Sequence, residues 1–519
     1  VIEYLNYGSD GFKTLPSGKN TGFNKNDVVA KFKVNLFPST AIQQTLDFKF
    51  QYADEVGNET YLGLSEADFK NNPFDRYAAS NNDQMTTDHT QYALTHTLEF
   101  TKDLHITTTA YRNNFSRNWY KLNDVTFDGN KKSIAAILND PTTLANHFSI
   151  VNGTVNSDAD ALGVKANNRK YYAQGIQTKL DYHWYKGDAF HDLEIGFRAH
   201  YDEEDRFQWV DKYRMSSNKN MDLTTAGVPG TDANRIASAT AFASYLTYKL
   251  KYNNWTFTPG VRYENITLKR EDFGKNDVKR TGADVALREN SVAIFIPGMG
   301  TNYKFHNDFS LFGGVHKGFS PPGNQNGQEP EESINYEFGT RFNLGKLKGE
   351  VVGFFNDYSN LLGSDLAATG GTGSLELFNA GEVNVNGIEV LLNYNIASEN
   401  SKIAIPVSFG YTFTNSAFQN SFGSADGLWG TVTKGDEMPY LPRHQLNTRI
   451  SLEHKDFEIN LNGRYNGEFR TLAGTGTIAN SEKVAANFIV DLSTKYFVNK
   501  KLNITANVIN LLDNTYAVS

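Results

Sequence analysis

Apolar and polar side chains alternate along most of the 519-residue chain. Every second residue is apolar in Val28–Leu36, Leu46–Tyr52 and Leu502–Val508, and the same alternation runs through Ile334–Leu344. A period of two residues is that of a β-strand with one apolar and one polar face. Helical periodicity is scarce, and a short loop helix is expected only at Lys132–Leu138. The chain is therefore predicted to be all-β.

The connections between the predicted strands alternate in length. Short turns are expected at Pro38–Thr40, Thr101–Leu104, Lys186–His191, Asn253–Asn254, His306–Asp308, Lys455–Asp456 and Val498–Lys501. Long polar segments lie between them, at Gly57–Asp88, Asn123–Asn168, Asp211–Arg235, Gly274–Glu289 and Gln419–Pro442. This alternation predicts an antiparallel meander whose long loops share one end. Outer-membrane barrels have this asymmetry, with short periplasmic turns and long outer loops.

Two kinds of β-protein carry such alternation, a transmembrane antiparallel β-barrel and a string of soluble β-sandwiches. The sequence has no linker rich in Pro and Ser and no break in composition between sandwich domains. Large rings recur at strand ends, as in the aromatic girdle of a membrane barrel: Tyr172, Trp184, Tyr248, Tyr252, Trp255 and Tyr263. We therefore expect a membrane barrel with these side chains toward lipid: Val28, Ala30, Phe32, Val34, Leu36, Ile334, Tyr336, Phe338, Phe342 and Leu344.

The number of predicted strands is about nineteen, from Val1–Gly8 to Leu502–Leu512. A closed bacterial barrel has an even number of strands, because both ends of the chain return to the same side. We therefore expect residues 1–519 to be part of a barrel that lacks at least one strand. No charged and then apolar leader begins at Val1, so any secretion signal is expected outside this sequence.

Composition narrows the functions that remain. The chain has 50 Lys and Arg against 58 Asp and Glu, a net charge of −8, which argues against charge-driven nucleic-acid binding. Because cysteine is absent, disulfides, zinc–thiolate sites and cysteine nucleophiles are excluded. The eleven histidines show no HExxH spacing, the acidic run Asp202–Asp205 lacks the EF-hand pattern, and neither GxSxG nor a P-loop occurs. We expect no enzyme activity, no metal site and no resident cofactor.

Seven segments carry a resemblance that is spread over the whole chain. They are ADFKNNPFDRYAASNNDQM at 67–85, NWTFTPGVRYE at 254–264, GVHKGFSPP at 314–322, EPEESINYEFG at 329–339, NAGEVNVNGIEV at 379–390, PRHQLN at 442–447 and NVINLLDNTYAVS at 507–519. In this order they resemble the TonB-dependent outer-membrane receptors, most closely the ferric-dicitrate type. The resemblance implies a 22-stranded barrel filled by an N-terminal plug. The plug and the last strand are expected to be absent from residues 1–519.

The same resemblance implies a function. It is active import of a ferric chelate, either ferric citrate or a siderophore, across a Gram-negative outer membrane, powered by the TonB complex. The segment after Phe319 reads SPPGNQNGQEPE and departs from the NPNL-type motif of haem receptors. Two alternatives stay open. One is uptake of another solute, such as cobalamin, a nickel chelate or a sugar, and the other is a passive porin.

A candidate ligand site lies near the acidic run. If Leu193, Ile195 and Phe197 face lipid, then period two turns Arg198, His200 and Arg206 toward the lumen. Trp209, Arg214 and Arg235 are expected in the next outer loop. Because arginine binds carboxylates in a bidentate manner, the candidate residues for an anionic ferric chelate are Arg198, His200, Arg206, Trp209, Arg214 and Arg235. Alternatively, these arginines only pair with the carboxylates of Asp202–Asp205.

Overall fold

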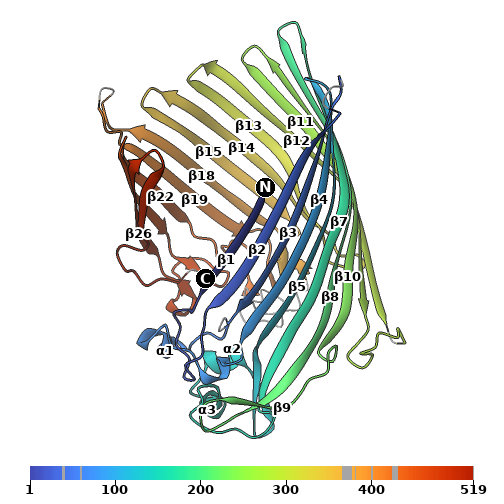
Figure 1. The fold of residues 1–519 in the computed structure, drawn as a ribbon, viewed down its shortest axis with the longest axis vertical. Helices are drawn as coiled ribbons and strands as arrows, with labels where there is room; N and C mark the ends of the chain where they lie inside the picture. The colour runs from blue at the N-terminus through green and yellow to red at the C-terminus, as the bar shows by residue number, and fades with distance from the viewer. Residues whose placement is uncertain are drawn as a thin grey trace.

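The computed structural model describes residues 1–37, 41–58, 61–283, 285–364, 377–379, 381–398, 401–423 and 431–517. The turn expected at Pro38–Thr40 lies outside these ranges. The described residues form one long antiparallel sheet that curls round on itself (Figure 1). No helix among them has the length and apolar character needed to cross a membrane.

Nineteen strands follow one another in the meander, and each pairs with the next. They are β1 (Ile2–Ser9), β2 (Phe23–Leu36), β3 (Gln43–Gly57), β4 (Gln84–Thr101), β5 (Leu104–Phe127), β7 (Leu162–Lys186), β8 (Ala189–Met215), β10 (Ala233–Tyr252), β11 (Trp255–Asp272), β12 (Ala286–His306), β13 (Phe309–Ser320), β14 (Glu331–Leu344), β15 (Leu347–Ser359), β18 (Val383–Asn395), β19 (Pro406–Phe418), β22 (His444–His454), β23 (Phe457–Asn466), β26 (Asn487–Asn499) and β27 (Leu502–Val508). The predicted count is confirmed. Within the described ranges, no pairing joins β1 to β27.

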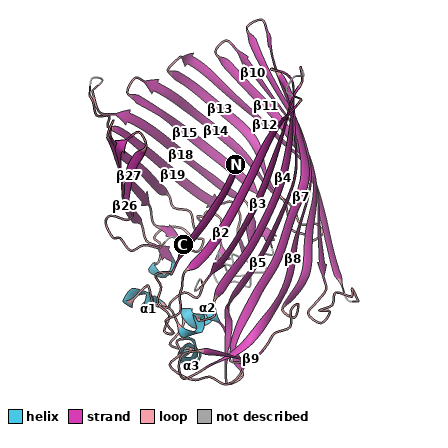
Figure 2. Cartoon of the chain, in the orientation of Figure 1, coloured by secondary structure: helices cyan, strands magenta, loops and turns pink. Residues whose placement is uncertain are grey.

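The connections alternate between short turns and long loops, as predicted. The turns lie at the upper end of Figure 1 and the long loops at the lower end, where all the helices gather (Figure 2). Two short single strands are β6 (Asn130–Ser133) and β9 (Met221–Thr225). Three pairs of short strands are β16 (Leu362–Ser364) with β17 (Leu377–Asn379), β20 (Phe422–Gly423) with β21 (Thr431–Val432), and β24 (Phe469–Arg470) with β25 (Lys483–Val484). The 3₁₀ turns are Ala78–Ser80 and Asn480–Glu482. The helices are α1 (Glu66–Asn71), α2 (Ile134–Asn139) and α3 (Ala145–Val151).

The helix expected at Lys132–Leu138 exists as α2, but it begins two residues later. Asn130–Ser133 pair with the end of β5 as strand β6, so the helix can start only after them. The Ser133 side chain accepts a hydrogen bond from the Ala136 amide at 3.3 Å, which is an N-cap.

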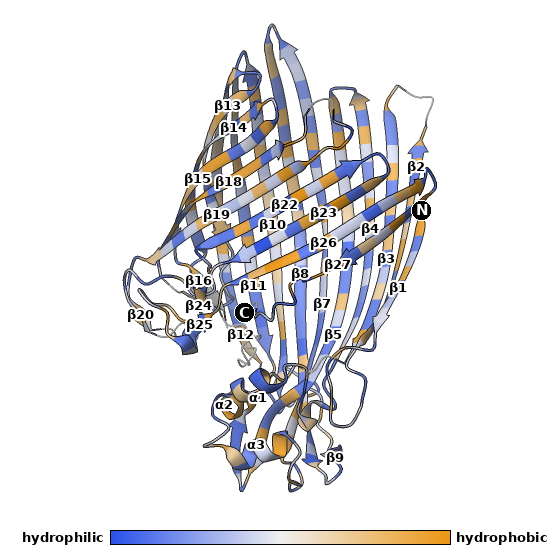
Figure 3. Cartoon of the chain, turned by 90° about the vertical axis from the view of Figure 1, so that its left-hand side faces the viewer, coloured by the Kyte–Doolittle hydropathy of each residue, from blue (hydrophilic) through white to orange (hydrophobic). Residues whose placement is uncertain are grey.

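The period-two faces are confirmed. Phe32 and Val34 are half exposed on one face, and their register partners Phe48 and Leu46 lie on the same face of β3. In β14, Tyr336 and Phe338 are likewise exposed on the face opposite to Glu337 and Arg341. Apolar and polar positions alternate along neighbouring strands in Figure 3. The apolar face is the outward one, because a barrel of this width turns apolar side chains to lipid and polar ones to its lumen.

Aromatic rings on the outward face mark a membrane band. Trp184, Tyr248 and Trp255 lie near the short turns, whereas Tyr172 and Tyr201 lie farther toward the loops. On β8 the outward side chains between His191 and Tyr201 are all apolar: Leu193, Ile195, Phe197 and Ala199. Ten residues span ~33 Å along a strand, and a tilt of ~40° reduces this to ~25 Å of height, which matches an outer-membrane apolar band. The loop-side halves of β5, β7 and β8 therefore project beyond the membrane.

A small folded layer covers the projecting strands at the loop end. Its buried apolar core joins the β3–β4 loop, the ends of β5, β7 and β8, and helices α2 and α3: Leu62, Tyr77, Ala78, Ala79, Leu122, Val125, Ile134, Ile137, Ile150, Val151, Leu162, Val164 and Met215. Asp83 is buried beside this core and accepts a hydrogen bond from the Leu122 amide at 3.1 Å. Burial raises the pKa of the Asp83 carboxyl to about 7.

Candidate anion site on the lumen wall

Four arginines form a row across the inner wall of the projecting strands. Arg117 on β5 is the register partner of Arg169 on β7. Arg169 in turn lies opposite Arg206 on β8, and Arg206 lies opposite Arg235 on β10. Side chains directly opposite each other in an antiparallel pair are ~5 Å apart, and like charges in such positions destabilise a sheet. We call Arg117, Arg169, Arg206 and Arg235 the arginine row. The row therefore differs from the usual cross-strand pairs, in which opposite charges face each other.

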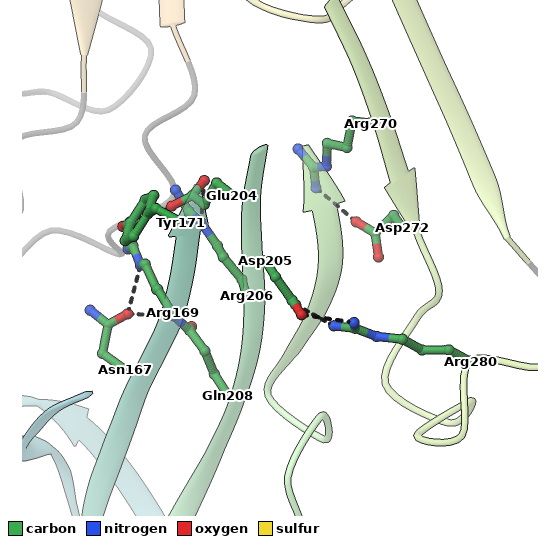
Figure 4. Close-up of polar contacts among 10 residues, drawn as sticks. All are labelled: Asn167, Arg169, Tyr171, Glu204, Asp205, Arg206, Gln208, Arg270, Asp272 and Arg280. Carbon is green, nitrogen blue, oxygen red and sulfur yellow. Dashed lines mark hydrogen bonds and ion pairs between the residues drawn. The ribbon is translucent and has the colours of Figure 1, made fainter. Parts of the chain in front are cut away.

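One carboxylate connects two members of the row. Glu204 lies 2.9 Å from Arg169 Nη1 and 3.0 Å from Arg206 Nε (Figure 4). Arg169 is 2% exposed and Arg206 is 4% exposed, so both guanidinium groups are fixed in place. Arg169 Nε also donates to Asn167 Oδ1 at 3.0 Å. Arg206 therefore does pair with a carboxylate of the acidic run, Glu204, as the alternative interpretation of the sequence predicts.

The acidic run does not balance the arginine row as a whole. Asp205 faces outward and forms a two-pronged ion pair with Arg280, at 2.5 and 3.0 Å, instead of a pair with Arg206. Glu203 also faces outward, where it accepts a hydrogen bond from the Tyr201 hydroxyl at 2.8 Å. Asp202 lies inward, 3.2 Å from His200 Nε2. Period two divides the run between the two faces of β8, so few of its charges reach the arginines.

The wall beside the row is cationic. Arg270 on β11 lies next to the row and pairs with Asp272 at 2.7 Å, so among the described residues five arginines share this face with Asp202, Glu204 and Asp272. Burial, followed by the nearby charges of Arg206 and Arg270, lowers the pKa of Arg235 to about 10. Arg235 therefore stays charged at neutral pH, and arginines outnumber carboxylates on this face of the wall among the residues that the structure describes.

A cavity of about 630 Å³ opens beneath the arginine row. Arg117 and Arg169 line it on one side together with Tyr171 and Phe115, and small residues such as Ala237 hollow the opposite side. The carboxylates of Asp202 and Glu204 also line the cavity, so it is the guanidinium side of this cavity that suits an anion. In the part of the chain that the structure describes, no three His, Asp or Glu side chains gather as metal ligands would.

The structure separates the six candidate residues. Arg206 and Arg235 are opposite each other in the arginine row. Arg198 and His200 lie six to eight residues nearer the turns, ~20–27 Å along β8. There the Tyr111 hydroxyl lies 3.0 Å from Arg198 Nε and 2.6 Å from His200 Nδ1.

The expectation that Trp209, Arg214 and Arg235 occupy an outer loop is wrong. Strand β8 continues to Met215 because its end pairs with β7, and Arg235 lies in β10. Period two turns Trp209 to the outward face, away from the lumen. Arg214 lies beyond the row, 3.3 Å from Asp222.

Sequence reasoning missed Arg117, Arg169 and Arg270. Each belongs to an alternating segment, but only the strand register aligns them with Arg206 and Arg235. A signal was present in the sequence, because every predicted strand near the acidic run carries an arginine close to its loop end.

The comparisons with known proteins decide the family. Residues 6–511 match the family model described as "TonB dependent receptor-like, beta-barrel". The chain belongs to the TonB-dependent receptor family. Its members are transport receptors of the outer membrane, so the membrane barrel predicted from the alternation is the fold of this family.

Solved structures of iron-uptake receptors and transporters share the fold at low sequence identity. The unliganded ferric citrate transporter FecA superposes with a TM-score of 0.71 at 16% identity, over 99% of this chain and 69% of that one. The ferric-catecholate import receptor Fiu of E. coli K12 gives 0.70 at 15% identity, over 100% and 74%. The ferric yersiniabactin uptake receptor FyuA of Yersinia pestis gives 0.69 at 12% identity, over 100% and 70%.

Proposed function

We propose that this receptor imports an anionic ferric chelate across the outer membrane of a Gram-negative cell. The observation that carries the proposal is the arginine row, which lines the lumen just above the membrane band. An incoming chelate would meet this wall after passing the loops. Carboxylate-rich chelates such as ferric citrate fit it best, because guanidinium groups bind carboxylates through paired hydrogen bonds.

The import would need parts beyond this barrel wall. We infer that an N-terminal plug fills the lumen and contacts the TonB complex, and that the chelate binds between the plug and the arginine row. A barrel of about 22 strands leaves a lumen too wide for its own side chains to fill, which supports the plug. The solved neighbours import ferric citrate, ferric catecholate and ferric yersiniabactin, which supports iron as the cargo.

Growth of a Gram-negative host under iron limitation tests this function. The full-length receptor should restore growth on ferric citrate only when TonB is present, and Arg206→Gln with Arg235→Gln should abolish this rescue. Asp192→Asn is the matched control, because it removes a charge on the same face of β8 near the turns. Rescue by cobalamin, a nickel chelate or a sugar instead would assign another cargo. Rescue without TonB would indicate a passive porin.

A further inference from the structure

One arginine faces the membrane rather than the lumen. Arg112 is exposed on β5, and its neighbour Tyr111 points into the lumen toward His200. Its cross-strand partners on the outward face are Tyr92, Gln174 and, one strand farther, Tyr201. Arg112 therefore lies among the outward aromatic rings at the loop side of the membrane band. A charge is tolerated at this level, where lipid headgroups begin, and not at the midplane.

The guanidinium group of Arg112 is held by neutral neighbours. Its Nη1 donates to Gln174 Oε1 at 2.8 Å, and its Nε donates to Asn114 Oδ1 at 3.0 Å. The group lies 4.6 Å from the ring centre of Tyr172. Asn114 and Tyr172 lie one step nearer the loops than Arg112, so the side chain reaches toward the headgroup level.

No carboxylate among the described residues forms an ion pair with Arg112. Glu203 is the outward carboxylate on β8, and it accepts hydrogen bonds from Tyr201 and Tyr172 at 2.8 and 3.4 Å. Arginine has five donors, and the contacts with Gln174 and Asn114 occupy two of them. The group is thus fixed and charged, and it has donors left for an anion.

An apolar groove begins beside this arginine. It is a cavity of about 600 Å³ on the outward face, with Arg112 at its edge. The small Ala110 lies between Leu94 and Ile176 on the neighbouring strands, and the small Ala199 lies between Ile176 and Phe242. Phe48 lines the groove beyond Leu94. The groove lies on the membrane-facing side of the wall, where a hydrocarbon chain would fill it.

We propose that Arg112 and this groove bind one anionic lipid of the outer leaflet. The lipid phosphate accepts hydrogen bonds from Arg112, and one acyl chain lies over Ala110 between Leu94 and Ile176. The charge of Arg112 favours an anionic headgroup over a zwitterionic one, because the zwitterion brings its own cation next to the guanidinium. The site lies on the opposite face of the wall from the arginine row, so it goes beyond the proposed import function.

Native mass spectrometry of the full-length receptor in detergent tests this site. The receptor is incubated with phosphatidylglycerol and phosphatidylcholine of identical acyl chains, and the bound lipids are counted. The wild type should retain phosphatidylglycerol preferentially, and Arg112→Gln should lower its retention about fivefold with phosphatidylcholine unchanged. Ala110→Leu keeps the charge but fills the groove, and it should lower the retention of both lipids.

Lys269→Gln is the matched control. Lys269 faces outward on β11, and its amine pairs with Glu271 at 2.9 Å, so its removal should leave lipid retention unchanged. Equal retention of the two lipids by the wild type would overturn the proposal. So would wild-type retention of phosphatidylglycerol by Arg112→Gln, or an equal loss in Lys269→Gln. Each variant should give the wild-type heat-modifiable mobility on a gel, which shows that its barrel is folded.

Discussion

Replacing Glu204 by glutamine separates a binding role of the arginine row from a structural one. Glu204 lies 2.9 Å from Arg169 and 3.0 Å from Arg206, so in the free receptor it occupies donors that an anionic chelate would use. The change removes a negative charge beside the proposed site and keeps the shape of the side chain. If the row binds the chelate, Glu204→Gln should therefore tighten binding.

The size of the effect follows from Coulomb's law. A chelate carboxylate ~6 Å from Glu204 is repelled by ~3 kcal/mol at an effective dielectric constant of ~20. Because a fifth of the Glu204 side chain is exposed (21%), solvent screening reduces this value, and we take about half of it. The expected gain is thus ~1.4 kcal/mol, or about tenfold in Kd.

The assay is calorimetric titration of the full-length receptor with ferric dicitrate. Asp192→Asn is the control, since Asp192 lies on the same face of β8, is paired with Lys249 at 3.4 Å, and is ~40 Å of strand away from Glu204. It should leave Kd unchanged within about twofold, which is ~0.4 kcal/mol. A Kd in Glu204→Gln equal to that of the wild type, or weaker, would refute the reasoning. The arginines would then be a structural network completed by Glu204.

Three further outcomes are expected. The folded pKa of Asp83 is raised to about 7 from an unfolded value near 4, so the loop layer should lose stability as pH rises from ~4 through 7. Hydrogen-exchange protection of the Leu122 amide should fall over this range, and Asp83→Asn should remove the dependence. Gly196→Ala should lower the free energy of unfolding in urea by ~1–3 kcal/mol, because the new Cβ would lie 2.0 Å from the Tyr245 ring. Gly300→Ala should leave the free energy of unfolding unchanged, because its new Cβ meets no atom within 4 Å. On intact cells, an impermeant maleimide should label a cysteine placed at Asp158 in the β5–β7 loop but none placed in the short turns; the reverse would invert the orientation.

The architecture could be predicted because it depends on local patterns. Alternation gave the two faces of each strand, and the spacing of polar segments gave the order of turns and loops. Where pairing extends a strand, local patterns fail. The sequence from Asp211 to Arg235 is polar and looks like a loop, yet β8 reaches Met215 because β7 extends alongside it. For the same reason Trp209 belongs to a strand and faces outward.

The site was only partly predictable because it is made by register. Period two correctly turned Arg206 inward, but nothing local shows which residue lies opposite it. Arg117 and Arg169 are 52 positions apart, with the folded loop layer between them, and a slip of one residue would turn either to lipid. The pairing of Asp205 with Arg280 joins residues 75 positions apart and also depends on tertiary structure.

Titration of the full-length Arg206→Gln/Arg235→Gln receptor with ferric dicitrate tests whether the arginine row binds the chelate. These two arginines are register partners in the middle of the row, and each charge-assisted hydrogen bond lost should cost ~1.5–3 kcal/mol. If the row binds the chelate, the affinity should fall 10- to 100-fold with the fold intact. An affinity within about threefold of the wild type, which is less than one 1.4 kcal/mol decade, would contradict this expectation and exclude the arginine row as the chelate site.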